Sequence, residues 1–141
     1  MGRLHTEQFA CLPGGPYAIP AMHVEIGAVF TNTVPVGVTR GPGFSENTNL
    51  LERLIDRAAA ETGVARMELL RRNLVGAAAM PFTNAGGSVI DSGTFAANLD
   101  AALRRARTGY EERRRASEAA GRLRGIGAVY HIKATYGAPE E

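Results

Sequence analysis

Tryptophan is absent from this sequence of 141 residues, and aromatic residues make up only 6% of it. Cysteine occurs once, at Cys11, which excludes an intramolecular disulfide framework and a cysteine-based zinc site. No apolar run reaches the roughly 18 residues that a membrane-spanning helix needs, and the N-terminus lacks an apolar stretch of signal-peptide length. We therefore expect a cytoplasmic protein with no membrane role.

A strong excess of charge is also missing. The 16 basic and 14 acidic residues give a net charge of +2, a field too weak to indicate nucleic-acid binding. The hydrophobic content of 45% suffices for one folded domain of ordinary size. The 17 glycines, with so few aromatics, predict many tight turns and a modest core whose burial a neighbour would complete.

Extended segments are predicted at both ends of the chain. Residues 23–30 and 125–133 are rich in apolar and β-branched side chains, which is typical of strands. Residues 34–38 form a second, shorter extended piece. Residues 81–90 are typical of a hairpin with its turn over Asn84–Gly87.

Helical spacing of apolar residues predicts helices between these segments. The first begins after Ser45 as N-cap and ends at Gly63. Its inner stripe comprises Leu50, Leu51, Leu54, Ile55, Ala58 and Ala59, and its charged residues Glu52, Arg53, Asp56 and Arg57 fall mainly on the other side. A short helix follows over 65–73, and a longer one runs from Phe95 to about residue 120 with a bend near Gly109. Residues 91–93 would cap this last helix, and the predicted fold class is α+β, a mixed α/β layout.

Few residues suggest catalysis or metal binding on their own. Cys11 with His5 or His23 lacks a third orienting group, so an incidental thiol is the simpler interpretation. The three histidines, which include His131, lack the close spacing of zinc ligands. The glycines of residues 121–127 precede a predicted strand, whereas a dinucleotide fingerprint follows a strand and opens a helix.

The arginines offer two features with two interpretations each. A basic band comprises Arg104, Arg105, Arg107, Arg113, Arg114 and Arg115; interleaved glutamates favour a solvated helix face, and a patch for an acidic partner is the alternative. Arg40 stands in a glycine-rich loop before a predicted helix start. Such a loop is either a structural turn with a surface arginine or an anion-binding loop.

Several short motifs resemble one family. Residues 15–20, GPYAIP, resemble the GPYxIPN segment in the large subunit of molybdenum hydroxylases, the family of xanthine dehydrogenase, aldehyde oxidase and carbon monoxide dehydrogenase. The family's further motifs follow along the chain in the same order. They are TNxxP (similar to residues 31–35), YRGAGRPE (40–46), LERLID (51–56), RRNL (71–74), MPY (80–82), DSG (91–93) and RGIG (124–127). The resemblance covers nearly the whole chain.

The resemblance implies a molybdenum–molybdopterin cofactor that takes two electrons from a substrate, with water as the oxygen source. It also implies iron–sulfur clusters and FAD on partner domains or subunits. Residues 1–121 would be the end of the first molybdopterin-binding domain, and residues 122–141 the first strand of the second. The expected partners are the remainder of the large subunit, or split-subunit chains, together with iron–sulfur and FAD subunits.

The same resemblance implies site residues. Arg40 and Gly41 would lie at the cofactor, and Pro42 and Phe44 would border the substrate pocket. Xanthine-type enzymes carry an aromatic residue where Pro42 stands, and carbon monoxide dehydrogenases carry a copper-binding cysteine where Gly41 stands. An aldehyde or an N-heterocycle is therefore the expected substrate.

No catalytic residue or metal ligand is assigned, because the family's catalytic glutamate has no counterpart here. We therefore expect a partial large subunit that is not catalytic alone. A non-catalytic binding or assembly module, or a truncated relic, is the alternative. In either case residues 125–133 would lack sheet partners, and the isolated chain would be marginally stable or oligomeric.

Overall fold

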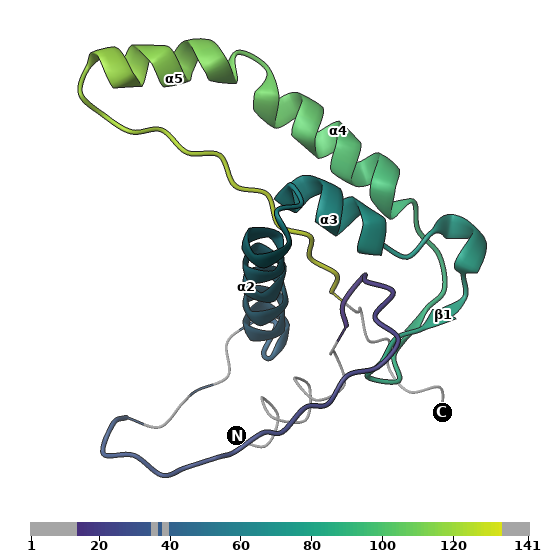
Figure 1. The fold of residues 1–141 in the computed structure, drawn as a ribbon. Coiled ribbons are helices and arrows are strands. Elements are labelled where there is room, and N and C mark those ends of the chain that lie inside the picture. Colours follow the sequence, from purple (N-terminus) through teal and green to yellow (C-terminus); the bar gives the residue numbers. More distant parts are fainter. Residues whose placement is uncertain (1–13, 35–36, 38–39, 134–141) are drawn as a thin grey trace.

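The computed structural model describes residues 14–34, 37 and 40–133. Within them, four helices, one short 3-10 helix and a two-stranded hairpin are joined by long extended segments (Figure 1). This arrangement confirms the predicted α+β class. The helices α2, α3 and α4 lie close to the small core, whereas α5 lies at the far end of α4 (Figure 1).

Helix α2 spans Phe44–Thr62 and is bounded by two glycines with left-handed backbones. It ends at Gly63 (φ 69°), whose N–H bonds to the Ala59 carbonyl at 3.0 Å, as predicted. Its N-cap is Gly43 (φ 78°) and not the predicted Ser45. The prediction is wrong because the left-handed turn at Gly43 directs the chain into the helix before a side-chain cap is needed.

Helix α3, Arg66–Asn73, packs against α2. The N-terminal loop, residues 14–19, is bonded to the C-terminal end of α3. The Ala18 N–H donates to the Asn73 carbonyl at 2.8 Å, and the Val75 N–H donates to the Pro16 carbonyl at 2.9 Å. These bonds fix residues 14–19 across the end of α3, which is how the GPYAIP segment comes to be anchored.

Helices α4, Phe95–Arg107, and α5, Tyr110–Ala119, are separated at Gly109 (φ 62°). The predicted bend is therefore confirmed. Helix α4 has Thr94 as its N-cap, so the predicted cap over residues 91–93 is wrong by one residue or more. An ion pair between Arg71 and Asp100 joins α3 to α4.

The predicted hairpin is confirmed. Strands β1, Phe82–Thr83, and β2, Val89–Ile90, pair antiparallel with Phe82 opposite Ile90. The Asn84 side chain closes the turn by accepting bonds from the Gly86 and Ser88 N–H groups at 3.0 and 2.9 Å. A short 3-10 helix over Ala77–Ala79, which the sequence did not indicate, precedes the hairpin.

The core is small, as the composition predicted. Among the described residues, its main cluster joins seven buried side chains: Tyr17, Leu51, Leu70, Leu74, Leu99, Leu103 and Tyr130. On α2 only part of the predicted inner stripe takes part, because Leu50 and Leu54 are 50% and 61% exposed. A face of α2 that looks apolar in sequence thus remains open to water in this chain.

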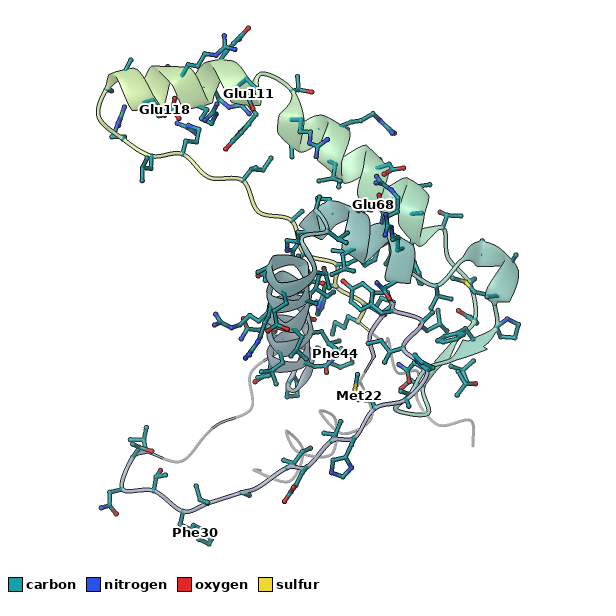
Figure 2. All side chains as sticks on the ribbon, viewed as in Figure 1. Met22, Phe30, Phe44, Glu68, Glu111 and Glu118 are labelled. Atoms are coloured by element: carbon teal, nitrogen blue, oxygen red, sulfur yellow. The ribbon has the colours of Figure 1, made fainter. Side chains whose placement is uncertain are left out.

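The predicted strands over 23–30 and 125–133 are wrong for this chain, since neither segment pairs with another in the described structure. A strand needs a partner to satisfy its backbone groups, and neither finds one here. Residues 20–34 instead extend away from the body, with a fully exposed Phe30 far from α2 (Figure 2). The predicted extended piece at 34–38 lies partly outside the described residues. Among the described helices, none is long and apolar enough to cross a membrane.

Candidate functional site

The Arg40 loop is a left-handed turn at the start of α2. Gly41 and Gly43 have φ angles of 74° and 78°, and the Phe44 N–H donates to the Gly41 carbonyl at 3.3 Å. Both backbones lie where a side chain would be strained, so the glycines are required by the turn. The Arg40 side chain is exposed and makes no hydrogen bond or ion pair with the described part of the chain.

The other two predicted site residues face inward to different degrees. Pro42 is half-buried, and Phe44 is only 4% exposed, at the end of α2 where the loop enters it (Figure 2). The Phe44 ring meets the His131 ring edge to face, with centroids 6.5 Å apart. In this chain Phe44 therefore anchors the loop to the body, while Arg40 is exposed.

Residues 128–133 reach this loop from the other end of the chain. His131 Nδ1 lies 2.8 Å from the Thr48 Oγ1, one turn into α2. Lys133 lies beside the loop itself, since a Cβ built on Gly41 would be 3.8 Å from the Lys133 Cε. The loop thus has His131 and Lys133 as neighbours, an association that the sequence did not indicate.

A buried carboxylate lies further along the same helix. Glu52 is 4% exposed and accepts bonds from the Tyr17 hydroxyl, from the Tyr130 N–H at 3.3 Å and from Arg66 Nη2 at 2.5 Å. Arg66 also pairs with Asp56 and donates to the Ala128 carbonyl at 2.6 Å. The helical spacing predicts Glu52 mainly on the solvent side of the helix. That prediction is wrong, because its three partners come from other segments of the chain.

The electrostatics of this cluster follow from its burial. Burial raises the pKa of the Tyr17 hydroxyl far above its ordinary value, and the hydrogen bond to the Glu52 carboxylate raises it further. Burial lowers the pKa of Arg66, but its bonds to Asp56 and Glu52 outweigh that effect and leave the pKa raised. Tyr17 therefore stays a neutral donor and Arg66 a cation, which is what Glu52 needs as a buried anion.

A cavity of about 380 Å³ lies between α2, the hairpin and residues 130–133. Its lining includes the apolar side chains of Leu51, Phe95 and Tyr130 and the charged residues Asp91 and Lys133. None of the four predicted site residues is among the described residues that line it. The cavity and the Arg40 loop thus share Lys133 as a common neighbour without being one pocket.

The remaining candidates give no further site. Cys11 and His5 lie outside the described residues, and His23 and His131 lie on separate segments. No group of three or more histidine, cysteine or carboxylate residues able to hold a metal ion occurs in the described parts of the chain. In the basic band, Arg114 pairs with Glu111 and Glu118 along α5, at 3.1 and 2.9 Å, as a solvated helix face would.

Comparison with known proteins identifies the family. The molybdopterin cofactor-binding domain family matches residues 1–74. The chain is 37% identical over 92 residues to the nicotine 6-hydroxylase large subunit of Paenarthrobacter nicotinovorans, covering 65% of this chain and 11% of the relative. It is 31% identical over 121 residues to the carbon monoxide dehydrogenase large chain of Hydrogenophaga pseudoflava, covering 82% of this chain and 15% of the relative.

A third relative and a solved structure agree with this assignment. The gamma subunit of the 6-hydroxypseudooxynicotine dehydrogenase complex of Paenarthrobacter nicotinovorans is 48% identical over 69 residues, covering 49% of this chain and 9% of the relative. The crystal structure of quinoline 2-oxidoreductase from Pseudomonas putida 86 matches with a TM-score of 0.65 and 34% identity, over 83% of this chain and 15% of that one.

The chain spans between 9% and 15% of the length of these relatives. Their names describe oxidoreductases and subunits of complexes, and the matched family binds molybdopterin. The fold of the described residues agrees with that of a solved member. The chain belongs to the molybdopterin cofactor-binding domain family, as a segment of a molybdenum-hydroxylase large subunit.

Proposed function

We propose that this chain supplies part of the cofactor site of a molybdenum-dependent hydroxylase of the xanthine dehydrogenase and aldehyde oxidase type. The observation that carries the proposal is the Arg40 loop, in which an exposed arginine precedes a glycine turn at the start of a long helix. When bound, the molybdenum–pterin group would supply the two-electron oxidation, with water as the oxygen source.

The residues of the loop suit an anionic cofactor. The Arg40 guanidinium presents a planar fork of N–H donors that matches phosphate geometry. Gly41 has no side chain, and a Cβ atom placed there would have the Lys133 Cε as its neighbour, at 3.8 Å. A ligand group can therefore approach the Gly41 backbone closely. The positive end of the α2 dipole favours negative charge at the same place.

Substrate contacts are proposed for Pro42 and Phe44. Pro42 would border the substrate pocket at the loop, and Phe44 would border it from the first position of α2. Pro42 offers no flat aromatic surface on which a purine could stack, and Gly41 offers no thiol to hold copper. Two relatives are named for nicotine and quinoline, which both contain a nitrogen heterocycle. We therefore propose an N-heterocycle as substrate, with an aldehyde as the second choice.

Partner chains or domains would complete the enzyme. Relatives named as a complex subunit, a large subunit and a large chain support a multi-subunit assembly. The proposed partners are the remaining parts of the large subunit together with components that carry iron–sulfur clusters and FAD. The exposed apolar residues of the unpaired segments, such as Phe30 and Leu123, would be covered by the remaining parts of the large subunit.

The test is affinity capture of the native particle that contains this chain, followed by measurement of its mass and of its molybdenum and pterin content. The informative variant is Arg40→Ala. Its matched control is Arg105→Ala, an exposed arginine on α4 without a bond to the described residues. We expect the control to retain molybdenum and Arg40→Ala to lose it.

Two outcomes would contradict the proposal. If Arg40→Ala keeps molybdenum and turnover at the level of the control, the loop is not at the cofactor. If the captured species contains this chain alone and no molybdenum, the alternative of a non-catalytic module or relic is correct.

A further inference from the structure

Residues 128–133 run antiparallel along one face of α2. From residue 128 onward, the Ala128 carbonyl accepts a bond from Arg66 on α3. The Tyr130 N–H then donates to Glu52 on α2, and His131 contacts Thr48 on α2. On the helix side the contacts fall at positions 52, 48 and 44, which are four residues apart. Residues with this spacing share one face of a helix, so the segment follows a single row of α2 down to its N-terminal end.

The contact at that end involves two residues of the row. His131 meets the Phe44 ring edge to face, with an interplanar angle of 68°, and its Nδ1 lies 2.8 Å from the Thr48 hydroxyl. Phe44 is the first residue of α2 and directly follows the Gly41–Gly43 turn. The imidazole therefore spans the first turn of the helix, at the point where the helix meets the Arg40 loop.

The segment is held in this position by side chains rather than by strand pairing, with Tyr130 buried in the core and bonded by Asn98 Nδ2 at 3.2 Å. It belongs to no strand among the described residues, so no ladder of backbone hydrogen bonds fixes its register. Glu52 and Arg66 fix its upper part at residues 128 and 130. Below them, His131 contacts Thr48 and Phe44 in the first turn of α2, and Lys133 lies beside Gly41.

We propose that His131 is a positioning residue for the Arg40 loop. Its ring holds Phe44 and Thr48 together, so that the first turn of α2, and with it the preceding glycine turn, keeps one conformation. Arg40 is then presented on an ordered backbone, which lowers the entropy lost when an anionic group binds. This inference rests on the proposed function, because it takes the loop as the place where the cofactor binds.

His131 makes two separable contacts, one with Thr48 and one with Phe44. His131→Phe keeps an aromatic edge for Phe44 but removes the bond to Thr48. His131→Asn places a polar atom near the position of Nδ1 and can restore that bond without the ring. His131→Ala removes both contacts. His23→Ala is the matched control, because His23 is an exposed histidine on the extended segment and lies in no site described above.

The test measures hydrogen exchange in the captured native particle, peptide by peptide, together with its molybdenum content. For His131→Ala we expect about tenfold faster exchange in the peptide that covers the first turns of α2, since one hydrogen bond and one aromatic contact are lost. Exchange in α3 should not change. His131→Asn and His131→Phe should each recover part of the protection, and molybdenum retention should follow the same order.

The outcomes separate this inference from the proposed function. If exchange at α2 equals that of His23→Ala, or if all helices exchange faster to the same extent, His131 does not position the loop and the inference is wrong. If exchange rises at α2 alone while molybdenum stays at the control level, His131 does position the loop, and the assignment of the loop to the cofactor is wrong instead.

Discussion

The Tyr17 hydroxyl donates a hydrogen bond to the buried Glu52 carboxylate, although 35 residues separate the two in sequence. Glu52 also receives the Tyr130 N–H from a third segment. One carboxylate thus joins the N-terminal loop, helix α2 and the segment that reaches the Arg40 loop. The small core of this chain is organised around a polar cluster as much as around apolar contacts.

Replacing Glu52 by alanine should therefore destabilise the chain strongly. The change leaves Arg66 without its most buried partner and the Tyr17 hydroxyl without an acceptor. Breaking a buried pair from one side costs about 3 kcal/mol in the free energy of unfolding. Urea denaturation followed by circular dichroism measures this. Glu61→Ala, which removes an exposed pair with Arg57, should change the stability little; equal effects of the two changes would contradict the role of Glu52.

Stability should also fall at alkaline pH. The folded chain raises the pKa of Tyr17 above its ordinary value of about 10. The phenol proton is thus held more tightly in the folded state, so this contribution is complete below pH ~10 and is lost as the pH rises above that value. For the natural chain, the urea concentration at the unfolding midpoint should therefore be lower above this pH than below it.

Tyr17→Phe separates this effect from general alkaline unfolding. The variant should be less stable than the natural chain at neutral pH, by about 1–2 kcal/mol, because Glu52 loses a donor. It should lose less additional stability on going to alkaline pH. Tyr110→Phe, which removes a bond from Tyr110 at the start of α5 to the Arg124 carbonyl, is the control and should keep the alkaline loss. An unchanged pH dependence in Tyr17→Phe would show that another group causes it.

Local sequence signals predicted the parts of the fold that depend on local geometry. Gly63 ends α2 and Asn84 closes the hairpin turn, because both effects act within a few residues. Glu52 was misplaced because its partners at Tyr17, Arg66 and Tyr130 are distant in sequence, and helical periodicity reports hydropathy alone.

The extended segments also show that local sequence cannot report contacts between distant parts of the chain. Residues 23–30 have the composition of a strand, yet composition supplies no pairing partner. For the site, the resemblance selected Arg40 and Gly41. It gave no indication that His131 contacts the start of α2 next to the loop, since that contact depends on where residues 128–133 lie in space. How Arg40 and Gly41 act remains a prediction.

The backbone of Gly41 offers a test of the loop that does not depend on side-chain charge. Its φ angle of 74° disfavours a side chain, so Gly41→Ala should destabilise the loop by about 1 kcal/mol. Gly76→Ala is the matched control, because Gly76 has φ −74° and open space around its Cβ position; this change should be neutral or slightly stabilising. In the assembled particle, Gly41→Ala should also lower molybdenum retention. Equal retention in both variants would contradict the placement of Gly41 at the cofactor.

The extended segment over residues 20–34 should make the isolated 141-residue chain self-associate. Phe30 is fully exposed and Val29 is 83% exposed, on a backbone that pairs with no strand among the described residues, and such segments invite association. Phe30→Ser should reduce the apparent mass in light scattering at a given concentration. Val89→Ser is the control, because Val89 is also exposed but lies in a paired strand. If the natural chain is monomeric at high concentration, the segment does not drive association. If both variants reduce the mass equally, exposed apolar area alone explains the effect and the unpaired backbone adds nothing.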